Sequence, residues 1–122
     1  MVKSDRSVDL MFRAFSDRTR LRILHLLDAG ELCVGDLVAI LRVPQPTASR
    51  HLAYLRKAGL VLARKVGLWS FYSLAPAQSS FQQKLLECLA DCFCEVPEIK
   101  ADSSAAAKIR KSGGCCPHGA AK

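Results

Sequence analysis

The stretch PQPTASRHLAYLRKAG, residues 44–59, has the pattern of a helix with two distinct faces. Pro46 suits the first helical turn, where its missing N–H costs no hydrogen bond, and Gly59 suits the left-handed position that closes a helix. One side at helical spacing is apolar and consists of Ala48, Leu52 and Leu55. A second side, about 100° away, is polar and consists of Thr47, Arg50, His51 and Tyr54. We therefore predict a helix that packs on a domain through one face and presents hydrogen-bonding groups on the other.

The residues before this helix complete a known structural motif. Val34–Leu41 predicts a shorter helix with an apolar side, and Arg42-Val43-Pro44 predicts a tight turn into the longer helix. Two helices joined by a short turn, with the second one basic, form a helix-turn-helix, whose second helix lies in the major groove of DNA. The alternative for the second helix taken alone is an ordinary surface helix with a solvated polar face.

Charge is distributed unevenly along the 122-residue chain, which has a formal net charge of +7. Residues 37–86 contain no Asp or Glu, and the acidic residues lie toward the two ends. The basic residues of this acid-free segment are Arg42, Arg50, Arg56, Lys57, Arg64, Lys65 and Lys84. A region of one charge sign attracts a polyanion and binds it less tightly as salt increases. Nucleic acid is favoured over a membrane surface, since no basic amphipathic helix with a bulky aromatic face is evident.

A β-hairpin is predicted directly after the helix-turn-helix. Leu60–Val66 and Trp69–Leu74 are its strands, and Gly67 is the turn residue. Its tip is expected to carry Arg64 and Lys65, so the hairpin suits a wing that grips the DNA backbone or minor groove; a hairpin that only covers the core is the alternative. The predicted DNA-contacting residues are Gln45, Thr47, Ser49, Arg50, His51, Tyr54, Lys57, Arg64 and Lys65.

Three further helices are expected around this unit. Val8–Phe15 and Arg18–Leu27 precede it, and Ser16 or Asp17 can cap the second of them. Gln78–Phe93 follows it. The apolar stripe of that last helix consists of Phe81, Leu85, Cys88, Leu89 and Cys92. A domain this small leaves little for such a helix to cover, so we assign it, with the first helix, to the interface of a homodimer.

The C-terminal part is expected to be an extension. Residues 1–95 are assigned to a winged helix-turn-helix DNA-binding and dimerisation domain, and residues 96–122 to an extension that ends in a flexible vicinal-cysteine tail. Pro97 is expected to stop the preceding helix. Asp102–Lys111 predicts a short helix, which Asp102 can cap.

Several classes of protein are disfavoured by the sequence. No apolar run is long enough to span a membrane, and the first residues lack the apolar core of a signal peptide, so a cytoplasmic protein without a membrane partner is expected. Six cysteines in such a protein are better interpreted as metal ligands or redox groups than as disulfides. An enzyme is not expected, because neither a phosphate-type loop with a nucleophilic cysteine nor a CxxC at a helix start is present.

Four stretches, in this order, carry a family resemblance: SDRTRLRIL at 16–24, ELCVGDL at 31–37, QPTASRHL at 45–52 and LRKAGLV at 55–61. Together they resemble the ArsR/SmtB family of metal- and metalloid-sensing winged-helix repressors. This resemblance implies a mainly α fold with a β-hairpin wing. It also implies a homodimer that binds double-stranded operator DNA and leaves it when an inducer binds.

The ligand residues that this chain lacks limit the choice of inducer. The best-known arsenic-responsive members of that family carry ELCVCDLC at the third helix, which gives three thiolates. This chain keeps Cys33 but has Gly35 and Val38 at the other two positions, so that site cannot form. The zinc-sensing members use Asp/His and His/Glu pairs on the last helix, where this chain has no histidine. Other arsenic-responsive members carry a vicinal cysteine pair near the C-terminus, which Cys115 and Cys116 resemble.

The thiols are the predicted sensing groups. Soft thiophilic ions select thiolates, and trivalent arsenic requires three sulfur ligands. Cys115 and Cys116 are expected to supply two. The third is expected from the folded part, where Cys92 ranks first, followed by Cys88, and then by Cys33 and Cys94, although a buried cysteine can also be a small core hydrophobe. The chain is therefore predicted to be a repressor without a permanently bound cofactor that releases its operator when As(III) or Sb(III) binds.

Two alternatives remain open. A disulfide or polysulfide between Cys88 and Cys92, or between Cys115 and Cys116, would make the same fold a thiol redox or reactive-sulfur-responsive repressor. In a constitutive architectural DNA binder the cysteines would be incidental, and replacing Cys115 and Cys116 by Ser would change nothing.

Overall fold

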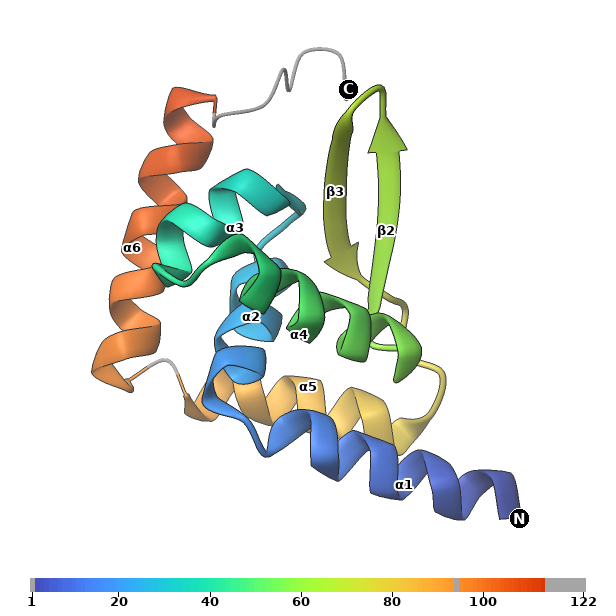
Figure 1. The fold of residues 1–122 in the computed structure, drawn as a ribbon. Coiled ribbons are helices and arrows are strands. Elements are labelled where there is room, and N and C mark those ends of the chain that lie inside the picture. Colours follow the sequence, from blue (N-terminus) through green and yellow to red (C-terminus); the bar gives the residue numbers. More distant parts are fainter. Residues whose placement is uncertain (1, 94, 114–122) are drawn as a thin grey trace.

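The computed structural model describes residues 2–93 and 95–113 (Figure 1). The elements in chain order are α1 (Val2–Phe15), α2 (Arg18–Asp28), β1 (Leu32–Cys33), α3 (Val34–Leu41), α4 (Gln45–Lys57), β2 (Val61–Val66), β3 (Trp69–Leu74), α5 (Ser80–Cys92) and α6 (Pro97–Ser112). The chain is mainly α-helical, and β2 and β3 form a hairpin that projects from the helices. This is a winged helix-turn-helix, as the sequence predicted.

The helix-turn-helix consists of α3 and α4 and has the predicted bounds within a few residues. α3 coincides with the predicted Val34–Leu41 and ends at Arg42, whose left-handed φ of 58° turns the chain. Pro46 lies in the first turn of α4, where the N–H it lacks is not needed. Gly59, with a φ of 81°, follows the helix in the left-handed conformation that was predicted for it.

The wing, defined as the β2–β3 hairpin of residues 61–74, is joined by a short third strand. β1 pairs antiparallel with β3, which gives the strand order β1-β3-β2. The sequence assigned Leu32 and Cys33 only to the approach to α3, because two residues are too few to show the alternation of a strand. Gly67 has a φ of 61° and forms the turn between β2 and β3, as predicted.

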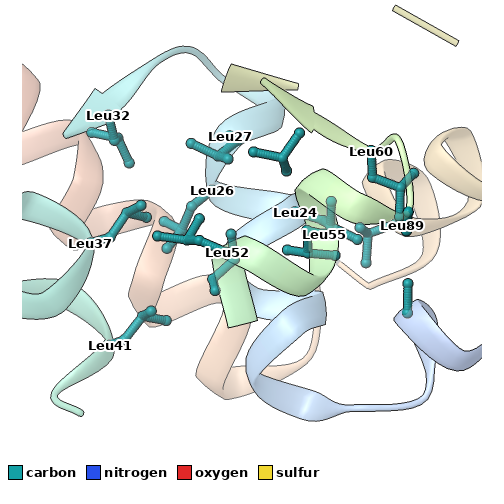
Figure 2. Packing of buried hydrophobic residues seen from close by; sticks show 14 of the residues in the cluster. Leu24, Leu26, Leu27, Leu32, Leu37, Leu41, Leu52, Leu55, Leu60 and Leu89 are labelled. Atoms are coloured by element: carbon teal, nitrogen blue, oxygen red, sulfur yellow. The ribbon is translucent and has the colours of Figure 1, made fainter. Parts of the chain in front are cut away.

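A leucine-rich core lies between the helices and the sheet, and Cys33 and Phe71 form a second, smaller cluster of buried residues. Figure 2 shows side chains from α2, α3, α4 and α5 converging on the leucine-rich core. The largest fully buried side chains are Phe71, Ile23, Leu24, Leu26, Leu32, Leu37, Leu52, Leu55, Leu60, Ile99 and Cys33. Burial of one aliphatic side chain of this size contributes about 1.5–3 kcal/mol. The predicted apolar faces of α3 and α4 are therefore confirmed as the surfaces that fix the orientation of α4.

α6 is longer than the predicted C-terminal helix. Pro97 suits a first helical position, so it begins α6 instead of stopping α5, which ends before it. Asp102 lies inside α6 and is buried, so the expectation that it caps a helix was wrong. Its carboxylate instead accepts two hydrogen bonds from Arg22 of α2, at 2.8 and 2.9 Å. Ile99 and Ala106 are buried too, and α6 packs on α2 and α3.

α1 and α5 lie near each other at the end of the molecule away from the wing (Figure 1). The rings of Phe12 and Phe81 meet edge to face, with centroids 5.5 Å apart. Phe12 is nevertheless 55% exposed, and Val8 on the same helix is 38% exposed. Within residues 2–93 and 95–113, no helix has the length and apolar character needed to cross a membrane.

Candidate DNA-binding surface and cysteine sites

The side of α4 that faces away from the core is polar and basic. Its exposed residues are Gln45, Pro46, Ser49, Arg50, Ala53, Arg56 and Lys57. Helix geometry fixes this side, because the buried residues Ala48, Leu52 and Leu55 hold the opposite side on the core. Four of the predicted DNA-contacting residues lie on it: Gln45, Ser49, Arg50 and Lys57. Arg56 also lies on this side but was not among the predicted DNA-contacting residues. Its position two helical turns after Ser49 would have indicated that it shares the outward side.

Thr47, His51 and Tyr54, also predicted to contact DNA, lie along one flank of α4 and are half-buried. The guanidinium of Arg20 from α2 is 4.2 Å from the centroid of the Tyr54 ring and 3.5 Å from Nδ1 of His51. The pKa of His51 is lowered, mainly because the side chain is partly buried. The carboxylate of Asp17, 3.9 Å away, acts to raise this pKa, and the positive charge of Arg20 acts to lower it further. These side chains therefore lie at the edge of the outward surface and not at its centre.

Arg20 joins three helices and is a residue that the sequence did not indicate. Its Nε and Nη2 donate hydrogen bonds to the carbonyl oxygens of Ala14 at 3.1 Å and Arg13 at 2.7 Å, both on α1. Together with the contact to Tyr54, these bonds tie α4 to α2 and α1. No spacing rule predicts the contact, because Arg20 and Tyr54 are distant in sequence and meet only through the packing of α2 on α4.

The sequence predicted that Arg64 and Lys65 lie at the tip of the wing, but the structure places both residues on β2, before the turn. The turn is at Gly67 and Leu68, and β2 continues past Arg64 and Lys65 before reaching it. Arg64 donates two hydrogen bonds of 2.7 Å to the carboxylate of Glu31, and these bonds raise its pKa. Lys65 is exposed. The charge of Arg64 is thus shared with a carboxylate in this structure.

The described cysteines lie in two kinds of environment. Cys88 and Cys92 are exposed on successive turns of α5, whereas Cys33 is fully buried. The Sγ atom of Cys33 accepts a hydrogen bond from the N–H of Asp36 at 3.4 Å and so caps α3. The residues outside the described ranges include Cys94, Cys115 and Cys116. Within the described ranges, no three His, Cys, Asp or Glu side chains gather into a group that could hold a metal ion.

α6 separates α5 from the chain segment that carries the vicinal cysteines. α5 ends beside the start of α6, and α6 runs from there to the level of α3 (Figure 1). The 16 residues of α6, at 1.5 Å per residue, make it about 24 Å long. Cys115 and Cys116 follow α6 and lie outside the described ranges, so α6 is the described element between α5 and the segment that carries them.

The last turn of α6 is held against the turn that leads into the sheet. Nη2 of Arg110 donates a hydrogen bond to the carbonyl oxygen of Gly30 at 2.7 Å and to that of Leu26 at 3.2 Å. The next residue after Gly30 is Glu31, which binds Arg64 of the wing. The end of α6 is thus connected to the wing through one short turn and one ion pair.

A short helix and a basic second helix joined by a tight turn, followed by a β-hairpin, define a winged helix-turn-helix DNA-binding regulator of transcription. The family model described as bacterial regulatory protein, arsR family, matches residues 17–62. The chain belongs to the arsR family, whose members are DNA-binding transcriptional regulators and not enzymes.

Individual proteins show how far the similarity extends. An uncharacterized HTH-type transcriptional regulator of Methanocaldococcus jannaschii is 49% identical over 73 residues, which are 59% of this chain and 81% of the relative. The arsenical resistance operon repressor of Escherichia coli is 46% identical over 78 residues, which are 63% of this chain and 67% of the relative. The solved structure of HlyU from Vibrio cholerae is 35% identical, with a TM-score of 0.67, and the match covers 78% of this chain and 100% of that one.

Proposed function

We propose that the chain is a transcriptional repressor that leaves its operator when trivalent arsenic or antimony binds to cysteine thiolates. The observation that carries the proposal is the exposure of Cys88 and Cys92 on successive turns of α5. Two exposed thiols on one helix face do not fill a hydrophobic core, and thiolates are the ligands that soft ions select. The similarity to the arsenical resistance operon repressor of Escherichia coli supports the choice of inducer.

In the proposed complex, α4 lies in the major groove. Arg50 at the centre of the outward surface suits a bidentate contact to guanine, and Lys57 near the helix end suits a phosphate. The remaining proposed contacts come from the same helix and the wing: Gln45, Thr47, Ser49, His51, Tyr54, Arg64 and Lys65. In a homodimer the two copies of α4 would enter successive major grooves, about 34 Å apart.

The homodimer interface is assigned to α1 and α5. Phe12 is 55% exposed beside Phe81, and Val8 is also exposed on the same helix. An exposed aromatic next to a second amphipathic helix forms a surface that a twofold-related copy can cover. The exposed Cys88 and Cys92 on α5 would then lie close to the partner subunit.

The inducer site that we propose is built from cysteine thiolates. Cys115 and Cys116 supply two of them. Cys92 of α5 is the first candidate for the third, with Cys88 as its substitute, and either protomer of the dimer can supply it. Ligands must be thiolates, so binding should release protons and weaken at low pH.

The signal is proposed to travel along α6. A pull on the segment after Gly113 acts on the last turn of α6, where Arg110 holds Gly30. Movement of Gly30 displaces Glu31 and with it Arg64 of the wing. Coupling of this kind is typically about 1–3 kcal/mol and must be reciprocal, so DNA should weaken inducer binding by the same factor.

The second candidate function is thiol redox or reactive-sulfur sensing by the same repressor. It is favoured by the exposure of Cys88 and Cys92 one helical turn apart. Cβ atoms at that spacing are about 5–6 Å apart. A disulfide needs about 3.5–4.5 Å, so oxidation would have to unwind the end of α5, whereas an ion or a chain of extra sulfur atoms could bridge the pair.

A release assay separates the two functions. A duplex enriched from a randomised library by the wild-type dimer would be followed by fluorescence anisotropy in the presence of a non-thiol reductant. We expect arsenite to release the duplex, and Cys115→Ser with Cys116→Ser to abolish release without weakening DNA binding. Release by an oxidant or polysulfide alone would favour the second function, and no release by any of them would contradict both.

Mixed dimers test which protomer supplies the third thiolate. A heterodimer is made from one Cys92→Ser chain and one chain carrying Cys115→Ser and Cys116→Ser, each with a different affinity tag. A site within one protomer is incomplete in both chains, whereas a site shared between protomers is complete once. One arsenic per heterodimer with three sulfur neighbours by X-ray absorption would show a shared site, and no bound arsenic would show a site within one protomer. Binding by the Cys92→Ser homodimer would instead indicate Cys88, Cys33 or Cys94 as the third ligand, or the vicinal pair alone.

A further inference from the structure

The wing ends in an apolar tip, and one exposed lysine, Lys65, lies near it. Leu68 at the turn is 98% exposed, and Trp69 beside it is 40% exposed. No other large hydrophobic residue in the described part of the chain is as exposed as Leu68. The fold therefore gains almost nothing from its side chain, which water surrounds on nearly all sides.

The turn itself does not require a leucine. Gly67 has a φ of 61°, and Leu68 is not among the residues with positive φ, which fits a two-residue turn with glycine in its first central position. Turns of this kind accept polar residues in the second position, where they are also better hydrated. Neither packing nor turn geometry explains Leu68, so its role depends on a partner that the surroundings of the tip would attract.

The positive charge near the tip favours an anionic partner. Lys65 is exposed on β2 near the turn, and the whole wing lies within the acid-free residues 37–86. Proteins that enter the minor groove of DNA commonly combine basic side chains with an apolar wedge such as leucine, which packs against the sugars or between base steps. An anionic membrane surface would also attract a basic hairpin with an apolar tip. Of the two, DNA is favoured because the wing follows α4 directly in this regulator.

The length of the wing suits this role. β2 and β3 have 6 residues each, which at about 3.3 Å per residue span about 20 Å. Half a turn of DNA, the separation of neighbouring grooves on one face, is about 17 Å. Figure 1 shows the hairpin rising from the end of α4 and projecting from the helices. A tip at that distance from α4 can reach the groove beside the one that α4 occupies.

We propose that Leu68, with Trp69 beside it, is an apolar wedge that enters the minor groove flanking the α4 site. The proposal rests on DNA binding by α4 and adds a specificity-determining contact to it. Such a contact selects DNA by groove width and ease of unstacking, so flexible pyrimidine–purine steps are the expected sequence at the wedge.

The test compares two exposed leucines of the same hairpin. Leu62, which is 51% exposed on β2 near the base of the wing, is the matched control. Leu68→Ser, Leu62→Ser and the wild-type dimer are titrated against the selected duplex over a range of salt concentrations. We expect Leu68→Ser to raise Kd about tenfold. We expect Leu62→Ser to raise it less than about twofold, and all three proteins to keep the same salt slope, because neither leucine pairs with a phosphate.

A base-stacking probe locates the wedge. With 2-aminopurine placed at successive steps of the duplex, the wild type should increase fluorescence at one minor-groove step, and Leu68→Ser should remove that increase. Equal affinities of the wild type and Leu68→Ser, or equal losses in both leucine variants, would overturn the proposal. Binding of phosphatidylglycerol vesicles that depends on Leu68, with unchanged DNA affinity, would also overturn it. Failure of the wild type to bind any duplex would instead refute DNA binding by α4.

Discussion

Arg22 of α2 and Asp102 of α6 form a two-point ion pair, with N–O distances of 2.8 and 2.9 Å. Both side chains are largely buried, at 13% and 6% exposure. Asp102→Ala would leave the Arg22 guanidinium without its main partner, although Glu98 stays 3.5 Å away. We expect a loss of about 2–3 kcal/mol in the free energy of unfolding, measured by urea denaturation.

The control for this pair is a residue on the same helix. Ser104 is exposed on α6, and Ser104→Ala should leave stability unchanged or slightly higher. The double variant Arg22→Met with Asp102→Leu leaves no buried charge unpaired, so it should recover at least half of the loss. A double variant as unstable as Asp102→Ala would show that shape, and not charge, fixes α6 on α2.

Arg110 is predicted to connect the end of α6 to the wing. Arg110→Met removes the donor to the carbonyl oxygens of Gly30 and Leu26 and should cost about 1–2 kcal/mol of stability. It should also reduce the effect of arsenite on DNA affinity while leaving the arsenic stoichiometry unchanged. Lys111→Met, at the exposed neighbouring position, is the control and should change neither quantity. Full induction in Arg110→Met would rule out this route for the signal.

His51 is predicted to make stability depend on pH. Burial lowers its pKa in the folded protein below the ordinary value of 6.5. As the pH falls below 6.5, the unfolded chain binds a proton at this histidine more readily than the folded chain does. The free energy of unfolding is therefore higher above this pH and decreases on acidification. When the pH is lowered from about 7.5 to about 5.5, the urea concentration at the unfolding midpoint should decrease. The decrease should be smaller in the His51→Gln variant. An equal fall in both proteins would assign the effect to other groups.

The sequence was sufficient for the helix-turn-helix and the wing because their signals are local. Pro46, Gly59 and Gly67 mark backbone positions with few alternatives, and the apolar spacing of Ala48, Leu52 and Leu55 gives the buried face of α4 directly. The outward surface follows from the same spacing, which is why Arg50 and Lys57 were placed correctly on it.

The errors concern contacts between distant segments. Asp102 looked like a helix cap because capping is the common local role of Asp, and only the packing of α6 on α2 reveals its pairing with Arg22. Arg64 looked like a free basic residue because its partner Glu31 lies in a different element.

Arg50 and Lys57 are predicted to contribute to DNA binding in different ways. Both are exposed on α4, but Arg50 lies at the centre of the outward surface and Lys57 at its last turn. Arg50→Ala should lower affinity for the selected duplex by about 1–3 kcal/mol, which is about 5- to 150-fold, and relax selectivity at one base pair. Lys57→Ala should weaken binding to all duplexes alike and reduce the salt slope by about 0.9 for each phosphate that is no longer neutralised. Lys100→Ala, exposed on α6, should alter neither affinity nor slope. Equal effects of Arg50→Ala on the selected duplex and on a scrambled one would show that Arg50 contacts the backbone and that another residue of α4 contacts the bases.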